Sequence, residues 1–387
     1  MSSSFERDRL TVLLYACIVA FGLAIAALGP AVPPLRADLG ISRTVAGLHF
    51  TALASGSVAV GLIGSRLVAW LGRKRVLQSG LVGLMVGPMG LVLGQSAVVT
   101  VLAAFAYGFA ANLVFLVVNG VLSDHHGEGR ATALAEANAV AATAFMLPGL
   151  LIGGLVATGL TWRLAFAAPI VVALALLRPV SNRSYPGASL EATEEGGRYL
   201  PGFAATVSAL GMSVAIEWSM ASWAAEQLVE VGTPVAVAAV GAAIFYGTVA
   251  VGRAMVVPLT RRFDEGRLLI VSLVVTAAGA TAFWLGESTI WVMSGVVLGG
   301  LGVSYQFPLL ASVMFAKAPG RTNAASARIS LVGGSAVLLA PLTLGVWADA
   351  RGLGEALSGI LVLVVVLGIA LAASLRGRET AASRLPT

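Results

Sequence analysis

Long runs of uncharged, apolar residues constrain this chain more than any other feature. LTVLLYACIVAFGLAIAALGPAV, from Leu10 to Val32, and LSGILVLVVVLGIALAASL, from Leu357 to Leu375, contain no Asp, Glu, Lys or Arg. A helix of about 20 such residues crosses the roughly 30 Å hydrocarbon layer of a bilayer. Composition agrees, because 58% of the residues are hydrophobic and 11% are charged, against about 25% charged in soluble domains. The chain is therefore predicted to have a membrane as its solvent.

The apolar runs are continuous and do not alternate, which indicates helices rather than the strands of a membrane barrel. We count twelve runs and predict an all-α membrane protein with twelve transmembrane helices. The predicted spans are residues 10–32, 44–69, 76–94, 98–122, 131–158, 162–178, 201–229, 235–259, 268–286, 289–316, 323–349 and 355–375.

The basic residues predict how these spans are oriented. Most Lys and Arg residues lie in the two tails and in the even-numbered connections, whereas the odd-numbered connections hold only Arg36, Arg43, Arg163 and Arg351. Because basic loops stay on the cytoplasmic side, both termini are predicted to be cytoplasmic in a multi-pass protein of the cytoplasmic (inner) membrane. Topology also accounts for the net charge of +6, so no nucleic-acid partner is expected.

A repeated segment predicts that the chain is built from two similar halves. GSVAVG, at Gly56–Gly61, returns as GTVAVG at Gly247–Gly252, and at the same offset Gly108 matches Gly299. Chance matches in a chain of low diversity are the alternative. The shared register, together with six spans on each side, favours duplication.

The division falls in PVSNRSYPGASLEATEEGGRY, a polar segment that follows the sixth span. Its glycine, proline and glutamate residues are typical of a linker. We therefore predict an N-terminal six-helix half at residues 1–178, a cytoplasmic linker at 179–200 and a C-terminal six-helix half at 201–387.

Two parallel six-helix halves joined in this way resemble the major facilitator superfamily. The loop after the second span carries the most telling residues: SRLVAWLGRKRVL, from Ser65, matches that family's loop pattern at Leu67, Gly72, Arg73 and Lys74. Ala69 stands where the family usually has aspartate. The resemblance implies alternating access around a central cavity lined by spans 1, 4, 7 and 10.

One acidic residue lies deep in a predicted span. Glu217 is near the middle of 201–229, whereas Glu136 lies about one turn inside span 5 and Asp349 at the edge of span 11. Burial disfavours an ionised carboxyl group, so Glu217 is predicted to bind and release a proton. The alternatives are a glutamate that only fastens span 7 to a neighbour, and one that contacts substrate without proton coupling.

Polar and aromatic residues of spans 4, 7 and 10 are the candidates for lining the implied cavity. Each polar one could instead form a hydrogen bond between helices. The substrate-cavity candidates are Asn112, Asn119, Trp218, Trp223, Tyr305 and Gln306. A local break is expected at Phe307-Pro308.

Charged residues near the cytoplasmic ends are candidates for gating. The family packs span 5 against span 8, so Glu136 and Arg253 are expected to form an ion pair between the halves that shuts the cytoplasmic side. Simple extension to lipid phosphates is the alternative for the arginines. The remaining gating candidates are Arg66, Arg328, Gly72, Arg73 and Lys74.

These observations predict a secondary transporter of a small organic solute that is proton-coupled, with a slight preference for export. Import of a nutrient, uncoupled transport and a non-transporting receptor of the same fold are the alternatives. Enzyme motifs, cofactor-binding motifs and metal-ligand sets are absent from the sequence, and Cys17 is the single cysteine. The expected partners are substrate, protons and membrane lipid, and the expected state is a monomer. No arginine is expected at the midplane, which disfavours a small multivalent anion.

Overall fold

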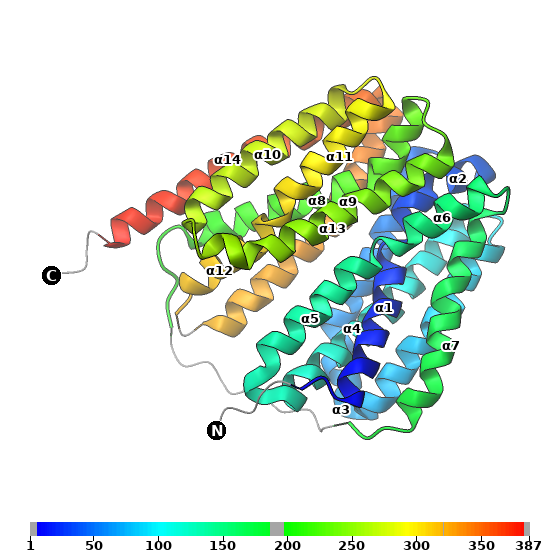
Figure 1. Ribbon diagram of the computed structural model, residues 1–387, viewed down its shortest axis with the longest axis horizontal. Helices are drawn as coiled ribbons and strands as arrows, with labels where there is room; N and C mark the ends of the chain where they lie inside the picture. Colours follow the sequence, from blue (N-terminus) through cyan, green and yellow to red (C-terminus); the bar gives the residue numbers. More distant parts are fainter. Residues whose placement is uncertain (1–5, 186–196, 320, 383–387) are drawn as a thin grey trace.

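The computed structural model describes residues 6–185, 197–319 and 321–382, and these residues form helices without any strand. In the first half the helices are α1 (Arg9–Ile25), α2 (Leu28–Leu39), α3 (Arg43–Leu93), α4 (Ala97–His126), η1 (Gly127–Gly129), α5 (Arg130–Ala144), α6 (Leu147–Ala157), η2 (Trp162–Phe166) and α7 (Ala167–Ser181). In the second half they are α8 (Phe203–Glu230), α9 (Val235–Thr260), α10 (Glu265–Leu285), α11 (Thr289–Ser304), α12 (Gln306–Ala316), α13 (Thr322–Arg351) and α14 (Leu353–Ala382). Figure 1 shows the two halves as separate bundles.

The described helices include 11 stretches that are long and apolar enough to cross a membrane. One of these, α3, has 51 residues and non-helical backbone at Gly72, so its two arms are separate spans. The twelve predicted spans and the all-α fold are therefore confirmed. Residues 186–196 of the predicted linker 179–200 lie outside the described residues, and α7 continues to Ser181, slightly beyond the predicted end of the sixth span.

The corner within α3 depends on a glycine. Gly72 has φ 80° and ψ 155°, a region that residues with a Cβ rarely occupy. This single residue reverses the chain between Leu71 and Arg73, where a longer loop would otherwise be required. The matched loop motif is therefore first of all a structural motif.

Three spans are broken, and each break lies four residues before a proline. α1 is capped at Ala26, α5 ends at Ala144 and α11 ends at Ser304. A proline lacks the N–H that would bond to the residue four positions earlier, and the prolines concerned are Pro30, Pro148 and Pro308. The break expected near Pro308 is thus confirmed, at Tyr305.

Glycines allow close packing of corresponding helix pairs in the two bundles. A Cβ on Gly108 of α4 would lie 2.1 Å from the carbonyl oxygen of Leu53 in α3. In the second bundle, a Cβ on Gly300 of α11 would lie 2.9 Å from the carbonyl oxygen of Phe245 in α9. Glycines therefore allow close approach of backbones in both halves, although Gly299, the repeat partner of Gly108, faces the Met220 side chain.

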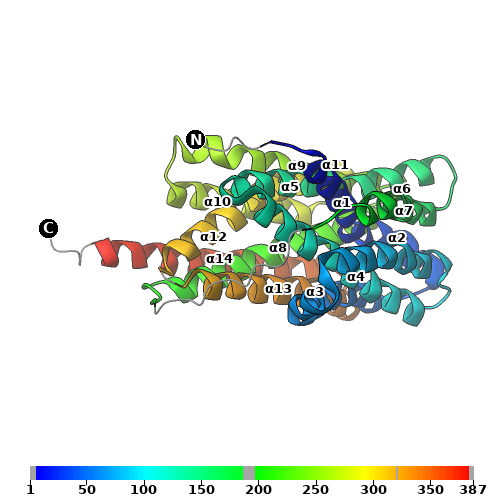
Figure 2. The ribbon, with the colours of Figure 1, turned by 90° about the horizontal axis from the view of Figure 1, so that it is seen from below.

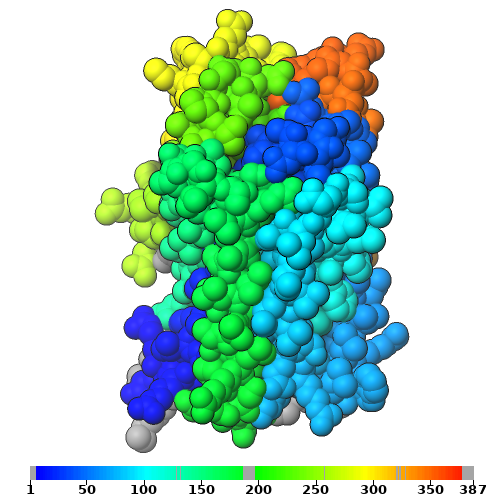
Figure 3. Space-filling view, turned by 90° about the vertical axis from the view of Figure 1, so that its right-hand side faces the viewer, coloured from blue at the N-terminus to red at the C-terminus, as the bar shows by residue number. Residues whose placement is uncertain are grey.

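The two bundles converge at one end and diverge toward the other. We call the end with both chain termini the tail end and the opposite one the loop end (Figure 1). Between the halves, α13 packs against α3, α2 against α8, and α6 against α9, and Figure 2 shows α13 beside α3. In the upper part of Figure 3, blue residues of α2 pack directly against the second half.

Candidate functional site

Glu217 and Arg253 form an ion pair within the second half. Glu217 lies in the middle of α8, and Arg253 lies about two turns from the end of α9. Nη2 of Arg253 donates to Oε1 of Glu217 at 2.9 Å and to Oε2 at 3.1 Å. The Glu217 side chain is 12% exposed and the Arg253 side chain 34%. This pair places a positive charge at the depth of the deep carboxylate, which corrects the expectation that no arginine reaches the midplane.

The surroundings of the pair are aromatic and incompletely satisfied. Tyr246, also in α9, is buried and interacts electrostatically with both charges. Arg253 Nε is buried and has no hydrogen-bond partner among the described residues. Because Arg253 holds both carboxylate oxygens through one nitrogen, the planar fork that guanidinium offers to a carboxylate is only partly used.

Glu136 has different partners from the expected one. Arg7 donates to it from Nε at 2.8 Å and from Nη2 at 2.6 Å, and Tyr15 donates at 3.1 Å. The expected pair of Glu136 with Arg253 is therefore absent from this structure. The reason is that α5 begins beside α1 at the tail end, whereas Arg253 points toward α8.

The start of α1 is held to the end of α4 by further polar contacts. Asp8 caps α1 by accepting from the Thr11 N–H at 2.8 Å, and it pairs with Nε2 of His125 at 2.8 Å. Partial burial raises the pKa of Asp8, but the hydrogen bonds from Thr11 and His125 outweigh this effect and lower the pKa to about 2.

A second group of charges joins the two halves at the loop end. We call it the loop-end cluster. Glu226 of α8 accepts from Arg36 of α2 and from Nε of Arg43 in α3, the latter at 3.3 Å. Arg43 Nη2 also lies 2.5 Å from Glu230. Asp349 of α13 accepts from the Arg43 and Thr44 N–H groups at 2.9 and 2.7 Å.

The loop-end cluster was not predicted as a site, although the sequence contains a signal for it. Its basic members, Arg36 and Arg43, lie in the first half, and its acidic members, Glu226, Glu230 and Asp349, lie in the second. On the side of the membrane where basic residues are scarce, such complementary charges on opposite halves are candidates for pairing across the interface. The cluster holds the halves together at this end.

Aromatic rings continue the contact between the halves toward the middle of the molecule. The ring of Phe21 stacks on Phe115 at 4.5 Å and lies 6.2 Å from Phe145. Phe145 in turn lies 5.4 Å from Tyr246, which belongs to the second half. We call these four residues the aromatic bridge.

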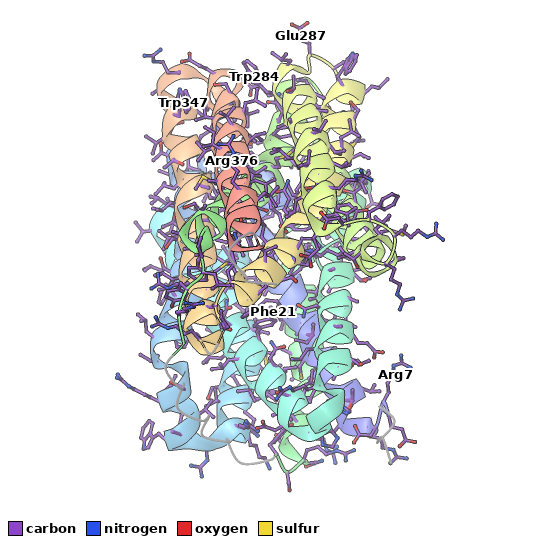
Figure 4. All side chains as sticks on the ribbon, turned by 90° about the vertical axis from the view of Figure 1, so that its left-hand side faces the viewer. Arg7, Phe21, Trp284, Glu287, Trp347 and Arg376 are labelled. Carbon is purple, nitrogen blue, oxygen red and sulfur yellow. The ribbon has the colours of Figure 1, made fainter. Side chains whose placement is uncertain are left out.

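One member of the bridge, Phe21, is labelled in the view from the left-hand side of Figure 1. Figure 4 shows Phe21 between the second half, marked by Trp284, Glu287 and Trp347, and the first half, marked by Arg7. The bridge therefore ends beside the Glu217–Arg253 pair, because Tyr246 belongs to the bridge and interacts with both charges.

The asparagines of α4 bond mainly to their own helix. Asn112 Nδ2 donates to the Gly108 carbonyl at 2.8 Å, and its Oδ1 accepts from Ser57 of α3 at 2.9 Å. Asn119 donates to the Phe115 carbonyl at 2.9 Å. Asn112 therefore forms the hydrogen bond between helices that was the alternative to substrate contact.

The candidates in α8 and at the junction of α11 and α12 divide between buried and half-buried positions. Gln306 is buried and donates to Thr276 of α10 at 2.8 Å, so it too fastens one helix to another. Trp223 is fully buried and donates to the Pro341 carbonyl at 3.2 Å. Trp218 and Tyr305 are half-buried.

The remaining gating candidates lie toward the tail end. Arg73 pairs with Asp124 of α4 at 2.5 Å, beside the Gly72 corner. Arg328 donates to the Tyr199 hydroxyl at 3.2 Å and lies 5.0 Å from the centre of its ring. Arg66 and Lys74 are exposed. Within the described ranges, we find no group of three or more His, Cys, Asp or Glu residues placed to hold a metal ion.

These features define a multi-pass membrane protein of two six-span bundles with a partly buried ion pair between helices of the second bundle. The first half of the chain, residues 14–198, matches the sequence model of the Major Facilitator Superfamily. An uncharacterized MFS-type transporter of Yersinia pestis is 23% identical over 366 residues, covering 89% of this chain and 91% of that protein. The chain belongs to the Major Facilitator Superfamily and is a transporter of that family.

Solved structures of transporters share the fold over nearly the whole chain. The nucleoside transporter NupG has a TM-score of 0.76 at 13% identity, covering 95% of this chain and 100% of that one. The D-xylose-proton symporter has a TM-score of 0.71 at 15% identity, covering 95% and 96%. A bacterial homolog of the human lysosomal transporter Spinster, inward-facing and occupied, has a TM-score of 0.70 at 17% identity, covering 97% and 98%. Such low identities establish the fold alone.

Proposed function

We propose that this protein is a proton-coupled secondary transporter that moves a small organic solute across the cytoplasmic membrane by alternating access. Both tails lie in the cytoplasm in this proposal, so the tail end is the cytoplasmic end and the structure is open toward the cytoplasm. The observation that carries the proposal is the deep carboxylate of Glu217, neutralised by Arg253.

A charge at this depth must be neutralised for the helices to move within the membrane. An unpaired ion in hydrocarbon costs at least about 3 kcal/mol. Glu217 can be neutralised by Arg253 or by a proton, and only the first of these holds α8 to α9 through charge-assisted hydrogen bonds. Protonation therefore changes how the two helices are held together, which is what coupling a proton to a conformational change requires.

The contacts between the halves support alternating access. The loop-end cluster joins them at one end, whereas near the tail end α1 packs against α4, α5 and α7 of its own half. In this proposal the loop-end cluster is the periplasmic gate and must break when the transporter opens outward. Two similar structures support the proposal, since one is that of a proton symporter and another is inward-facing.

The direction of transport depends on how the solute and the proton use the pair. A solute that competes with the proton for Glu217 is driven out by an inward proton gradient, as the expectation of export requires. A solute that binds together with the proton is driven in. The aromatic surroundings of Glu217 suit an apolar solute moving in either direction.

Transport by the purified protein tests the proposal. A thermal-shift screen over sugars, amino acids, organic acids and lipophilic cations identifies a solute, because a bound ligand raises the melting temperature. In proteoliposomes, an imposed pH gradient should then drive that solute against its own gradient, and a protonophore should abolish the accumulation. Equilibration without accumulation would indicate an uncoupled facilitator, and binding without any flux would indicate a receptor. Either result contradicts the proposal.

A further inference from the structure

Arg253, which binds Glu217 in this structure, is also positioned to bind the substrate. We propose that the solute is an amphipathic organic monocarboxylate, which binds the Arg253 guanidinium when Glu217 takes up a proton. This inference rests on the proposed proton coupling at Glu217. It names a substrate class and gives Arg253 the role of a substrate-binding residue.

The first support is the geometry of the guanidinium. Arg253 already holds a carboxylate, that of Glu217, through Nη2 at 2.9 and 3.1 Å. Protonating Glu217 weakens that attraction. The carboxylate of the solute then takes the place of the Glu217 carboxylate on Arg253. Nε of Arg253, which has no partner within the described part of the chain, supplies the second donor of a two-pronged contact with the solute.

The second support is the charge balance of the site. Without solute, ionised Glu217 and Arg253 sum to zero. With both proton and monocarboxylate bound, the charges of Arg253 and the solute again sum to zero. Binding only the proton leaves a net charge of +1, and binding only the anion leaves −1, both of which are costly within a membrane. Proton and anion therefore bind together, and a dianion would leave an uncompensated charge.

The third support is the aromatic bridge beside the pair. Tyr246 interacts with both charges, and its ring lies 5.4 Å from that of Phe145. Phe145 belongs to the first half, and the aromatic contacts continue from it to Phe21 and Phe115 of the same half. An apolar or aromatic body attached to the carboxylate would contact these rings, so the solute would touch both halves. Contact with both halves is how a ligand biases their relative positions.

Joint binding of proton and anion makes this a symport site. The inward proton gradient then drives uptake, which departs from the slight preference for export drawn from the sequence. That preference was drawn from the aromatic residues near Glu217, without taking into account that Arg253 pairs with Glu217. The position of Arg253 decides between the two directions, because a fixed cation repels the cationic solutes that would compete with the proton for Glu217.

The test measures binding to the detergent-solubilised full chain, because weak acids also cross lipid bilayers unaided. The probes are benzoate, phenylacetate, cinnamate and octanoate, each compared with its neutral amide by thermal shift at about pH 5.5 and about pH 8. At least one carboxylate should raise the melting temperature. Its affinity should be at least about tenfold higher at the lower pH than at the higher pH. Its amide should have no effect.

Variants at the pair make the result specific. Glu217→Gln mimics the protonated carboxyl group, so at about pH 8 it should bind the carboxylate at least as tightly as the wild type does at about pH 5.5. Arg253→Gln should abolish binding, and Arg253→Lys, which keeps the charge and loses the fork, should weaken it about tenfold. Arg262→Gln removes an exposed arginine just beyond α9 and should bind like the wild type. If Arg253→Gln does not fold, the Lys variant and Glu217→Gln still decide the question.

The outcomes separate this inference from the proposed function. Binding by no carboxylate, equal stabilisation by the amides, or full binding in Arg253→Lys would overturn the substrate assignment. A neutral solute found by the broader screen and accumulated by a pH gradient would leave the proton-coupled transporter standing while rejecting the monocarboxylate. Carboxylate binding that requires Arg253 but is the same at both pH values would keep the substrate class while rejecting proton coupling at Glu217.

Discussion

Arg253 of α9 donates to both carboxylate oxygens of Glu217 in α8, at 2.9 and 3.1 Å, and so joins two neighbouring helices of the second half. Removing one partner leaves the other charge buried without compensation. Arg253→Gln should therefore lower the free energy of unfolding, by less than the roughly 3–5 kcal/mol typical of fully buried pairs because Arg253 is partly exposed. Glu217→Gln in the same chain should restore most of the loss. Thermal melts of both single variants and the double variant measure this coupling, and additive losses would show that the contact contributes nothing.

The loop-end cluster should control opening of the loop end. Glu226→Gln removes the carboxylate that accepts from both Arg36 and Arg43, so the closed state should lose about 2 kcal/mol relative to the open one. Spin labels at Gln95 and Ser288, which are exposed in opposite halves at this end, should report a larger population of long distances in a Cys17→Ala background. Glu355→Gln is the matched control, because Glu355 pairs with Arg351 of its own half. An equal response from both variants would mean that Glu226 does not hold the gate.

Two glycines of α3 should respond oppositely to alanine. Gly72 has φ 80°, which strains any residue with a Cβ, so Gly72→Ala should destabilise the protein by about 1–3 kcal/mol. Gly61 lies within the helix and has open space around its Cβ position. Gly61→Ala should therefore be neutral or stabilise by up to about 1 kcal/mol. Melting temperatures measure both effects, and a Gly72→Ala protein as stable as the wild type would refute the role given to the corner.

The orientation predicts which residues each aqueous phase can reach. Cysteines at Ser184, beyond α7, and at Ser288, between α10 and α11, are exposed and lie at opposite ends of the molecule. In a Cys17→Ala background, an impermeant thiol reagent added to intact cells should label the Ser288 position alone. Labelling at Ser184 should require broken cells. The reverse pattern would invert the proposed orientation.

The arrangement of helices could be predicted from the sequence because it depends on local features. Charge-free runs give the spans, and Pro308 gives the expected break, four residues earlier in the chain. Each of these effects acts within one or two helical turns of the residue that causes it. Glycines that let neighbouring backbones approach occur in both bundles, as at Gly108 and Gly300.

The partners of the charged residues could not be predicted in the same way. An arginine side chain is long, so Arg253 reaches a carboxylate well inside the bundle although its own Cα lies nearer the helix end. Because the family packs span 5 against span 8, Glu136 was expected to pair with Arg253. Its partner in the structure is Arg7, from the N-terminal tail. Glu217, in contrast, could be singled out because depth within a span follows directly from residue number.

Solute accumulation by the Glu217→Gln protein tests the central claim most directly. Proteoliposomes containing the wild type, Glu217→Gln or the control Glu287→Gln, an exposed loop glutamate, are compared for exchange and for accumulation driven by a pH gradient. We predict that Glu217→Gln keeps exchange, because the amide mimics the neutral acid, and loses accumulation, because it cannot release a proton. Glu287→Gln should retain both activities. Undiminished uphill transport by Glu217→Gln would contradict the account and place the proton-coupling group elsewhere in the chain.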